Sequence, residues 1–338
     1  MKPYNDFWLD CVANNLMAIL IHENESFNSL PINFKAQYWK KIKNQSFSSH
    51  ETFLSLQKQG LFIPKVIYNN DELYSFFNIN KLIIEPNNHN NVHSLIKEAL
   101  SRGQFIFVQM DRFFYKSGRE SGKIHLVHPT FIYDCDDDER NYIGFEDCIS
   151  PGKMHPYKIP FDVIDLSIQH FRENNKNIEL QTFSLKTEML ENYHFNLSNH
   201  REIIDQYCIN NVIYHQEFDL YYQVGISSLY EYAEEMEELL LNLTEPGIFL
   251  LRMNSFIHNH KRNKLLINFL YSNKKIAKNI FNEIMDNLNA LTISWTIHKN
   301  FSLKRLQTNN KDNSIELKNN LSNIIGLEEK FCDLLMKT

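Results

Sequence analysis

The 338-residue sequence is poor in glycine, with nine in all, and none of them stands in a GxGxxG or GxxxxGK[S/T] pattern. The common glycine-rich loops that bind dinucleotides and nucleoside triphosphates are therefore excluded. Long hydrophobic runs are missing as well, since stretches such as Phe249–Leu251 fall far short of a membrane-spanning helix. The first residues include no apolar signal segment, so we expect a cytoplasmic protein that does not act in a membrane.

Cysteine is also sparse, and its five positions neither form an even set nor contain a CxxC pair. This spacing excludes a disulfide framework and a zinc site built from cysteine pairs, and it suits a reducing compartment. The net charge of −6 argues against a protein that binds nucleic acid by broad electrostatic attraction. Nothing in the sequence calls for a metal ion or for an organic cofactor of the protein's own.

The distribution of proline divides the chain, because eight of the nine prolines lie at or before Pro160. The first part shows mixed helix and strand patterns, whereas later segments repeat apolar residues at helical spacing over 228–241, 272–295 and 315–336. The polar stretch 173–177 lies at the change and is the best linker. We therefore predict an α+β protein with a catalytic domain at 1–172 and a mostly helical domain at 178–338. The helical domain would shape the acceptor pocket or a dimer surface, and Ile257–His260 within it has the composition of a polar loop.

Four elements of the first part bear on function. Apolar residues from Cys11 onward repeat at helical spacing, and the continuous apolar run at 104–110 is typical of a buried strand. Two further strands, at 127–133 and 141–145, flank an acidic connection of hairpin length at 134–140.

Three residues in these elements suit nucleophilic catalysis. Cys11 opens the first helix, where aligned backbone amides favour a thiolate. His128 begins a strand and Asp147 ends the next, so antiparallel pairing through 134–140 would bring them to the same end of a hairpin. An acid there orients one imidazole nitrogen while the other faces a thiol. The sequence thus predicts a Cys11–His128–Asp147 triad, with His125 as the alternative base.

A less specific interpretation competes with the triad. A lone cysteine on an amphipathic helix is usually a small buried hydrophobic residue. Asp10 stands beside Cys11, and its carboxylate would oppose thiolate formation if it pointed inward. A catalytically inactive scaffold or binding protein is therefore an alternative to an enzyme.

Several motifs resemble those of one family. They are Cys11–Leu16, Gly103 with Phe105–Val108 and Asp111, Phe113–Tyr115, His125–His128, Phe131–Tyr133, Asp134–Asp136, Phe145–Asp147 and, further on, Gly225–Ala233. Together they resemble the butirosin-biosynthesis protein H-like N-terminal domain family of papain-like cysteine acyltransferases, over roughly two-thirds of the chain. The spacing from His128 to Asp136 fits the family and favours His128 over His125. Asp134–Cys135 replaces the usual Gly-Tyr of the turn.

The resemblance implies a papain-like catalytic domain that moves an acyl group through an acyl-Cys11 intermediate. The donor would be a thioester on the phosphopantetheine arm of an acyl carrier protein or peptidyl carrier domain, and the acceptor a small-molecule amine. The setting would be secondary-metabolite biosynthesis, of an antibiotic or peptide. Papain-like enzymes place a glutamine shortly before the nucleophile to bind the oxyanion, and Asn5 is the matching donor here.

Two further expectations accompany this function. An acidic carrier needs local positive charge, and the clusters 40–43, 261–264 and 274–275 are the candidates. A papain-like peptidase or amidase, which transfers the acyl group to water, would use the same catalytic residues and is the alternative enzyme. A homodimer is left open.

Overall fold

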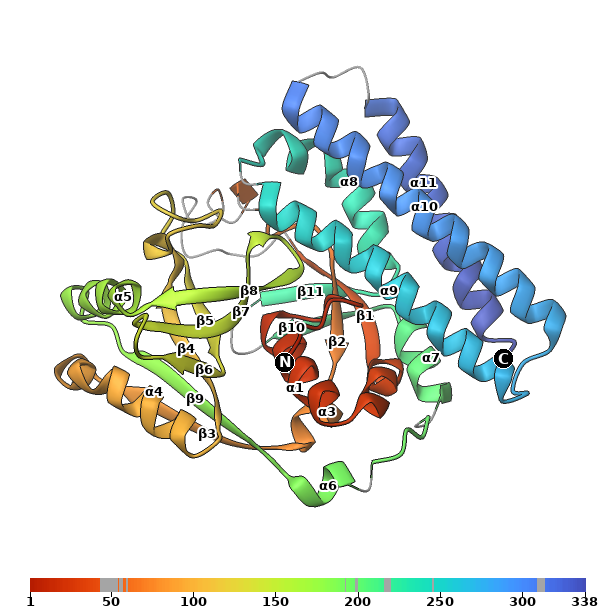
Figure 1. Ribbon diagram of the computed structural model, residues 1–338. Coiled ribbons are helices and arrows are strands. Elements are labelled where there is room, and N and C mark those ends of the chain that lie inside the picture. Colours follow the sequence, from red (N-terminus) through yellow and green to blue (C-terminus); the bar gives the residue numbers. More distant parts are fainter. Residues whose placement is uncertain are drawn as a thin grey trace. The chain divides into compact units, whose positions relative to one another are not determined.

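The computed structural model describes residues 1–42, 60–191, 193–197, 200–215, 220–244, 246–308 and 314–338, together with 54, 57 and 58 (Figure 1). The chain divides into two units, each made of two separate segments. Unit 1 comprises Met1–Leu30 and Asn70–Phe195, and unit 2 comprises Pro31–Asn69 and Asn196–Thr338. Both units combine helices with antiparallel sheets, as expected for an α+β protein. Within the described residues, no helix is long and apolar enough to cross a membrane.

Unit 1 contains most of the strands. Its helices are α1 (Cys11–Glu23), α3 (Asp71–Ser75), α4 (Val92–Ser101), α5 (Phe161–Glu173) and α6 (Thr187–Glu191), with short 3-10 turns at Glu25–Asn33, Pro86–Asn91 and Arg112–Phe114. Its strands are β3 (Phe77–Ile84), β4 (Phe105–Asp111), β5 (Val127–Ile132), β6 (Asp134–Asp136), β7 (Asn141–Ser150), β8 (Lys153–Pro160) and β9 (Ile178–Leu185). They form a four-stranded antiparallel sheet in the order β3-β9-β4-β5 and a three-stranded sheet in the order β6-β7-β8.

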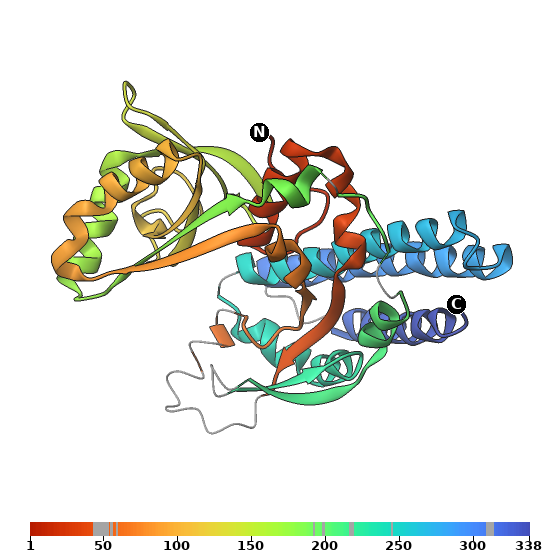
Figure 2. The same ribbon diagram turned by 90° about the horizontal axis from the view of Figure 1, so that it is seen from below.

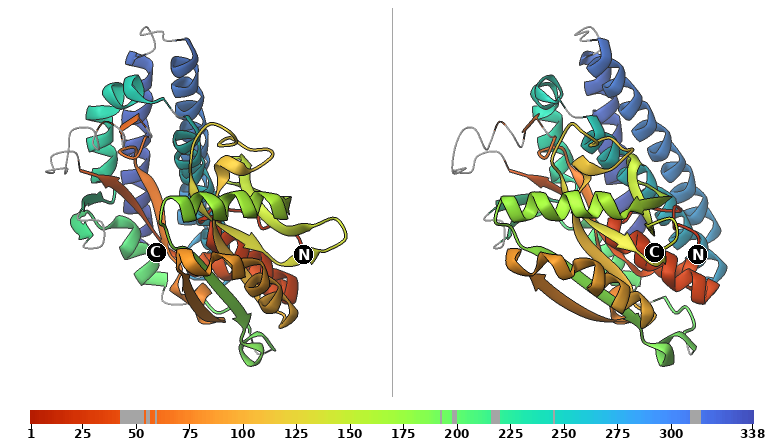
Figure 3. Two further views of the ribbon diagram at one scale, coloured as in Figure 1. Left: turned by 90° about the vertical axis from the view of Figure 1, so that its left-hand side faces the viewer. Right: turned by 60° about the vertical axis from the view of Figure 1, so that its left-hand side comes forward.

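Strand β4 of the larger sheet is buried on both faces because it is apolar at successive positions. Ile106, Val108 and Met110 of β4 belong to a core cluster with buried residues of α4 and α5. Figure 3 shows these two helices lying over the sheet, in front of it in the left-hand view. Phe107 alternates with these residues and packs instead against Phe131 of β5. The period-two alternation of strand side chains thus places the core cluster on one face of β4 and a group of phenylalanines on the other.

Strand β7 passes very close to β5. The Tyr133 amide donates a hydrogen bond to the Ile143 carbonyl oxygen at 3.0 Å. A Cβ atom on Gly144 would stand only 1.9 Å from the carbonyl oxygen of Phe131, so only glycine fits there. His128 lies three residues before Phe131 on β5, and Asp147 lies three residues after Gly144 on β7. The sequence predicted that these two residues lie close together.

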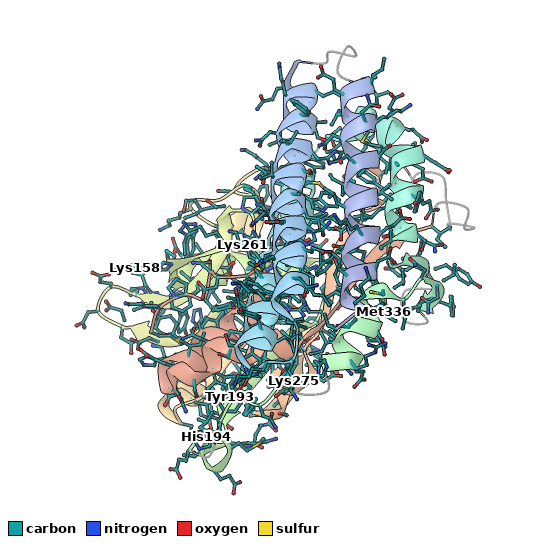
Figure 4. All side chains as sticks on the ribbon, turned by 90° about the vertical axis from the view of Figure 1, so that its right-hand side faces the viewer. Lys158, Tyr193, His194, Lys261, Lys275 and Met336 are labelled. Carbon is teal, nitrogen blue, oxygen red and sulfur yellow. The ribbon has the colours of Figure 1, made fainter. Side chains whose placement is uncertain are left out.

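Unit 2 contains the long helices. Its strands β1 (Lys35–Lys41), β2 (Lys65–Asn69), β10 (Asn211–His215) and β11 (Leu220–Val224) form an antiparallel sheet in the order β10-β11-β1-β2. Its helices are α7 (His200–Cys208), α8 (Ser227–Asn242), α9 (Pro246–Ser272), α10 (Lys278–Thr308) and α11 (Ser314–Leu335). Helix α10 packs against both α9 and α11, and the long helices run side by side in Figures 2 and 4.

A buried carboxylate joins four elements of unit 2. Glu328 of α11 is completely buried and accepts hydrogen bonds from the hydroxyl groups of Tyr38 and Tyr207, each at 2.8 Å. The Trp295 indole N–H donates to the same carboxylate at 3.1 Å, and His260 Nε2 lies 3.0 Å from it. These partners come from β1, α7, α10 and α9, so Glu328 connects the sheet with the helices. Burying such a charge is tolerated only with this number of polar partners.

Two expectations about the later part of the chain need correction. The segment Ile257–His260 is no loop, because it lies inside α9 and both Asn259 and His260 are completely buried. The stretch 173–177 does not separate the two units, because β9 directly after it pairs with β3 and β4 of unit 1. The expected ranges 1–172 and 178–338 therefore differ from the observed units, which also assign 31–69 to the helical unit.

Candidate active site

Cys11 is the first residue of α1, and polar side chains fix the chain around it. The Asp10 carboxylate caps the helix by accepting a hydrogen bond from the Ala13 amide at 2.7 Å. The Asn14 side chain donates to the carbonyl oxygen of Phe7 and accepts from the amide of Leu9, both at 2.8 Å. These bonds hold the segment that leads into α1, so the position of Cys11 is set by rigid local structure.

A buried charged cluster lies just after β4 and within β7, which continues past the predicted strand end to Ser150, and it is the centre of the candidate site. It consists of Arg112, Glu146 and Asp147, which are each less than a tenth exposed. The Arg112 guanidinium pairs with Glu146 and donates to Asp147 Oδ1 at 2.6 Å. The Tyr115 hydroxyl donates to Glu146 at 3.0 Å, and Arg119 lies 3.8 Å from the other oxygen of Asp147. We call this set the charged cluster.

His128 is the second residue of β5 and lies beside the charged cluster. Its side chain is 17% exposed, and its Nδ1 lies 4.0 Å from Glu146 without a hydrogen-bond partner. Burial lowers the pKa of His128 to about 3, and the positive charge of Arg112 adds to the effect, while Asp147 opposes it. The imidazole is therefore neutral at pH 7 and free to accept a proton.

The two carboxylates of the charged cluster differ in their ionisation. Burial acts to raise the pKa of Asp147, but Arg112 and His128 outweigh it and hold that pKa below its usual value. Burial raises the pKa of Glu146, and Arg112 compensates only in part. Arg112 thus favours the ionised form of both carboxylates, and its effect prevails over burial only at Asp147.

The helix start predicted a thiolate at Cys11, but the groups around Cys11 favour the protonated thiol. Burial raises the pKa of the Cys11 thiol well above its ordinary value, and the negative charges of Asp10 and Asp147 raise it further. Arg112 acts in the opposite direction but does not compensate. The helix-terminus effect amounts to only about 0.3–1 kcal/mol at ordinary sites, so desolvation and the neighbouring acids prevail. The thiol is protonated at neutral pH.

The structure thus brings Cys11, His128 and Asp147 into one charged neighbourhood, since Arg112 and Asp147 act on the pKa of both Cys11 and His128. The hydrogen bond of Asp147 goes to Arg112 rather than to the imidazole. His125, the alternative base, lies in a different cluster, where its Nδ1 is 2.6 Å from Asp111.

Asn5 is held by the backbone of β8. Its side-chain nitrogen donates to the Met154 carbonyl oxygen at 2.9 Å, and its side-chain oxygen accepts from the Met154 amide at 2.7 Å. Only the second N–H of the Asn5 amide remains for an oxyanion. The free N–H groups in the first turn of α1 are further donors at the same helix start.

Sequence reasoning missed Arg112, Glu146 and Tyr115. Glu146 stands next to the predicted Asp147, and Arg112 follows the predicted strand, yet charged residues at strand ends are usually solvated. Only the crossing of β7 over β5 turns them inward, and no local pattern signals it.

The basic clusters expected to bind a carrier are only partly exposed. Lys40 is completely buried and lies 2.8 Å from Glu235, so it is wrong as a docking residue, and Lys43 lies outside the described residues. Arg262 is buried in α9. The exposed lysines are Lys261, Lys274 and Lys275, of which Figure 4 labels the first and last.

The site thus groups a partly buried thiol, an imidazole and a carboxylate around one arginine, residue types that serve in nucleophilic catalysis. Searches against protein-family models and against curated proteins find no match for this chain.

Proposed function

We propose that the chain is a cysteine-dependent acyltransferase in which Cys11 carries the acyl group and His128 transfers the proton. The observation that carries the proposal is geometric: Cys11 at the start of α1 and His128 of β5 both lie close enough to Arg112 and Asp147 of the charged cluster to feel their charges. A neutral thiol has a proton to give, and a neutral imidazole has a free lone pair to accept it. General-base catalysis of this kind needs no preformed thiolate.

The first half-reaction forms the acyl-enzyme. As the Cys11 sulfur attacks the carbonyl carbon of a thioester, His128 takes the thiol proton. The carbon–sulfur bond to the donor then breaks, and His128 gives the proton to the departing thiolate. Glu146 and Asp147 stabilise the transient imidazolium, while Arg112 prevents it from persisting. The N–H groups at the start of α1 and the free N–H of Asn5 are the oxyanion donors in this mechanism.

The second half-reaction releases the product. An amine attacks the acyl-Cys11 thioester, His128 accepts a proton from the amine nitrogen, and the carbon–sulfur bond to Cys11 breaks. The proton returns to the Cys11 sulfur, so the enzyme is restored. Because water competes with the amine at this stage, the partial burial of Cys11 favours transfer over hydrolysis.

The substrate classes in this proposal rest on the family resemblance. The donor is a carrier-protein thioester on phosphopantetheine, which belongs to the partner, and the acceptor is a small-molecule amine of a secondary-metabolite pathway. Unit 1 then acts as a papain-like catalytic domain, with its nucleophile at a helix start and its base and acid on neighbouring strands. Lys261, Lys274 and Lys275 are exposed positive charges suited to an acidic carrier.

The test is acylation by an N-acetylcysteamine thioester, which mimics the end of the phosphopantetheine arm. Intact-protein and peptide mass spectrometry should find the acyl group on Cys11 and should find none in Cys11→Ser. His128→Asn should slow acylation by roughly 100-fold or more, the usual contribution of a general base. Cys135→Ser is the matched control, because Cys135 is a partly exposed cysteine of the same unit. Acylation that survives in Cys11→Ser refutes the proposal.

Adding amines separates the enzyme classes. Faster loss of the acyl group with a rising amine concentration, together with amide formation, supports transfer. Release as free acid at a rate independent of the amine supports a peptidase or amidase.

The second candidate function is a non-catalytic scaffold, and the raised pKa of Cys11 favours it, since burial and Asp10 both oppose the thiolate. A scaffold predicts no acylation of Cys11 by any thioester and unchanged biological output in Cys11→Ala. Loss of that output in a folded Cys11→Ala protein would exclude the scaffold.

A further inference from the structure

A second polar cluster of unit 1 joins residues that the proposed mechanism does not use. Asp111 ends β4, His125 precedes β5, and His170 lies in the last turn of α5. His125 Nδ1 lies 2.6 Å and His170 Nε2 lies 3.5 Å from the same oxygen, Asp111 Oδ2. The three ligand atoms lie within 4.8 Å of one another, a grouping found once among the described residues.

The Asp111 carboxylate is rigidly oriented. Its side chain is completely buried, and its other oxygen, Oδ1, accepts hydrogen bonds from the amides of Phe113 and Leu126, both at 3.0 Å. The Asp111 amide donates to the Ser167 hydroxyl at 2.6 Å, which fixes β4 to α5 close to His170. One carboxylate oxygen is thus occupied by the backbone, and the other is left for the two imidazoles.

The imidazole rings are also held in place. His125 stacks on His170 with ring centres 4.4 Å apart and planes inclined by 7°, and it stacks on Phe113 from the other side at 4.1 Å. The outward side is open, since the His125 side chain is 49% exposed. Fixed donors with one solvent-facing side are what a metal site with exchangeable water ligands requires.

We propose that Asp111, His125 and His170 bind a divalent transition-metal ion such as Zn²⁺. Two imidazole nitrogens with one carboxylate oxygen are a donor set of zinc and non-haem iron sites, whereas Ca²⁺ and Mg²⁺ prefer oxygen ligands alone. The ion takes the place of the proton between Oδ2 and Nδ1, so these atoms move apart. The neutral ring of His125 then carries its proton on Nε2, and water completes the coordination.

The position of the cluster gives the ion a structural consequence. Asp111 is followed directly by Arg112 of the charged cluster, and His125 stands three residues before His128. The ion would therefore fix the end of β4 and the approach to β5. This inference does not depend on acyl transfer, because its test measures the metal and not the reaction.

The experiment uses the full chain without an affinity tag, after treatment with a chelator and removal of the chelator. Zn²⁺ binding is measured by competition against a chromophoric chelator, and Co²⁺ is added to record the absorption spectrum of the site. We expect one ion per chain and a Co²⁺ spectrum of nitrogen and oxygen ligands. Asp111→Asn and His170→Gln should each weaken Zn²⁺ binding by roughly 100-fold or more, since loss of an outer-shell partner alone costs 10- to 100-fold.

The matched control is His93→Gln. His93 lies 3.1 Å from Asp165 in the same unit, as a pair that has no second histidine. This variant should bind Zn²⁺ as the unmodified chain does.

Circular dichroism shows which variants fold. Asp111→Asn should fold because its side-chain oxygen still accepts hydrogen bonds from the two backbone amides. His125→Gln should fold because the side chain it changes is half-exposed. Unchanged affinity in a folded variant overturns the proposal. So does the absence of stoichiometric binding, or a thiolate-to-Co²⁺ charge-transfer band, which would assign the ion to a cysteine.

Discussion

The pH dependence of stability tests the environment of His128 without any substrate. Burial and Arg112 lower the pKa of the folded imidazole to about 3, against 6.5 for an exposed histidine. The unfolded chain therefore binds a proton below about pH 6.5 that the folded chain excludes. The stability that depends on this difference is fully present above pH 6.5 and is lost as the pH falls from 6.5 toward 3.

The size of the effect follows from the pH interval. Each pH unit below 6.5 removes up to about 1.4 kcal/mol from the free energy of unfolding, so the loss reaches about 2 kcal/mol at pH 5. The His128→Asn variant lacks this titrating group. Between pH 7 and pH 5, its free energy of unfolding should therefore fall by about 2 kcal/mol less than that of the unmodified protein. Other histidines titrate equally in both proteins and cancel in the comparison.

Hydrogen exchange followed by mass spectrometry suits the measurement, because it reports the opening of unit 1 separately from that of unit 2. Peptides from β4, β5 and β7 give the opening free energy at pH 7 and pH 5, after correction for the intrinsic exchange rate at each pH. Equal losses in the two proteins would refute the buried neutral imidazole, and with it the general-base role of His128.

Four further predictions concern stability and can be checked by urea denaturation. Arg112→Met should cost about 3–5 kcal/mol, because it leaves two buried carboxylates without their cation. Gly144→Ala should cost at least about 1–3 kcal/mol through the contact with the Phe131 carbonyl oxygen. Gly326→Ala, where a new Cβ meets nothing within 4 Å inside α11, should instead stabilise by about 0.5–1 kcal/mol. Glu328→Gln should cost about 1.5–3 kcal/mol, since hydrogen bonds to a buried charge are lost or weakened.

Several elements could be predicted from sequence periodicity because their burial is regular. The apolar run at 104–110 corresponds to β4, and the helical pattern at 228–241 corresponds to α8 at Ser227–Asn242. Helix α9 escaped prediction at Ile257–His260 because its polar side chains are buried against polar partners. His260, for example, contacts Glu328. A contact between residues so far apart in the sequence cannot be detected from the spacing of apolar residues within one helix.

The candidate site shows the same limit. The hairpin prediction was only partly right: the turn at 134–140 joins β6 to β7, whereas β5 pairs with β4 in the other sheet. His128 and Asp147 nevertheless lie close enough to act on each other's pKa. The ionisation of Cys11 was predicted with the wrong sign, because the sequence shows the helix start but not the depth of burial. The partner of Asp147 was unpredictable too, since Arg112 follows β4 and meets Asp147 only because β5, the neighbour of β4, packs against β7.

The division of each unit between two chain segments has a consequence for the order of folding during synthesis. Strand β1 leaves the ribosome early, but its partner β11 at Leu220–Val224 is made much later, after most of unit 1. During this time, β1 and β2 lack strands β10 and β11 and the helices of unit 2. Their apolar side chains are therefore exposed to solvent. Unit 1 is able to close first, once β9 has been made. Pairing between such distant segments is slow and exposes the nascent chain to aggregation, so the yield of folded protein should depend on chaperones and on the rate of translation.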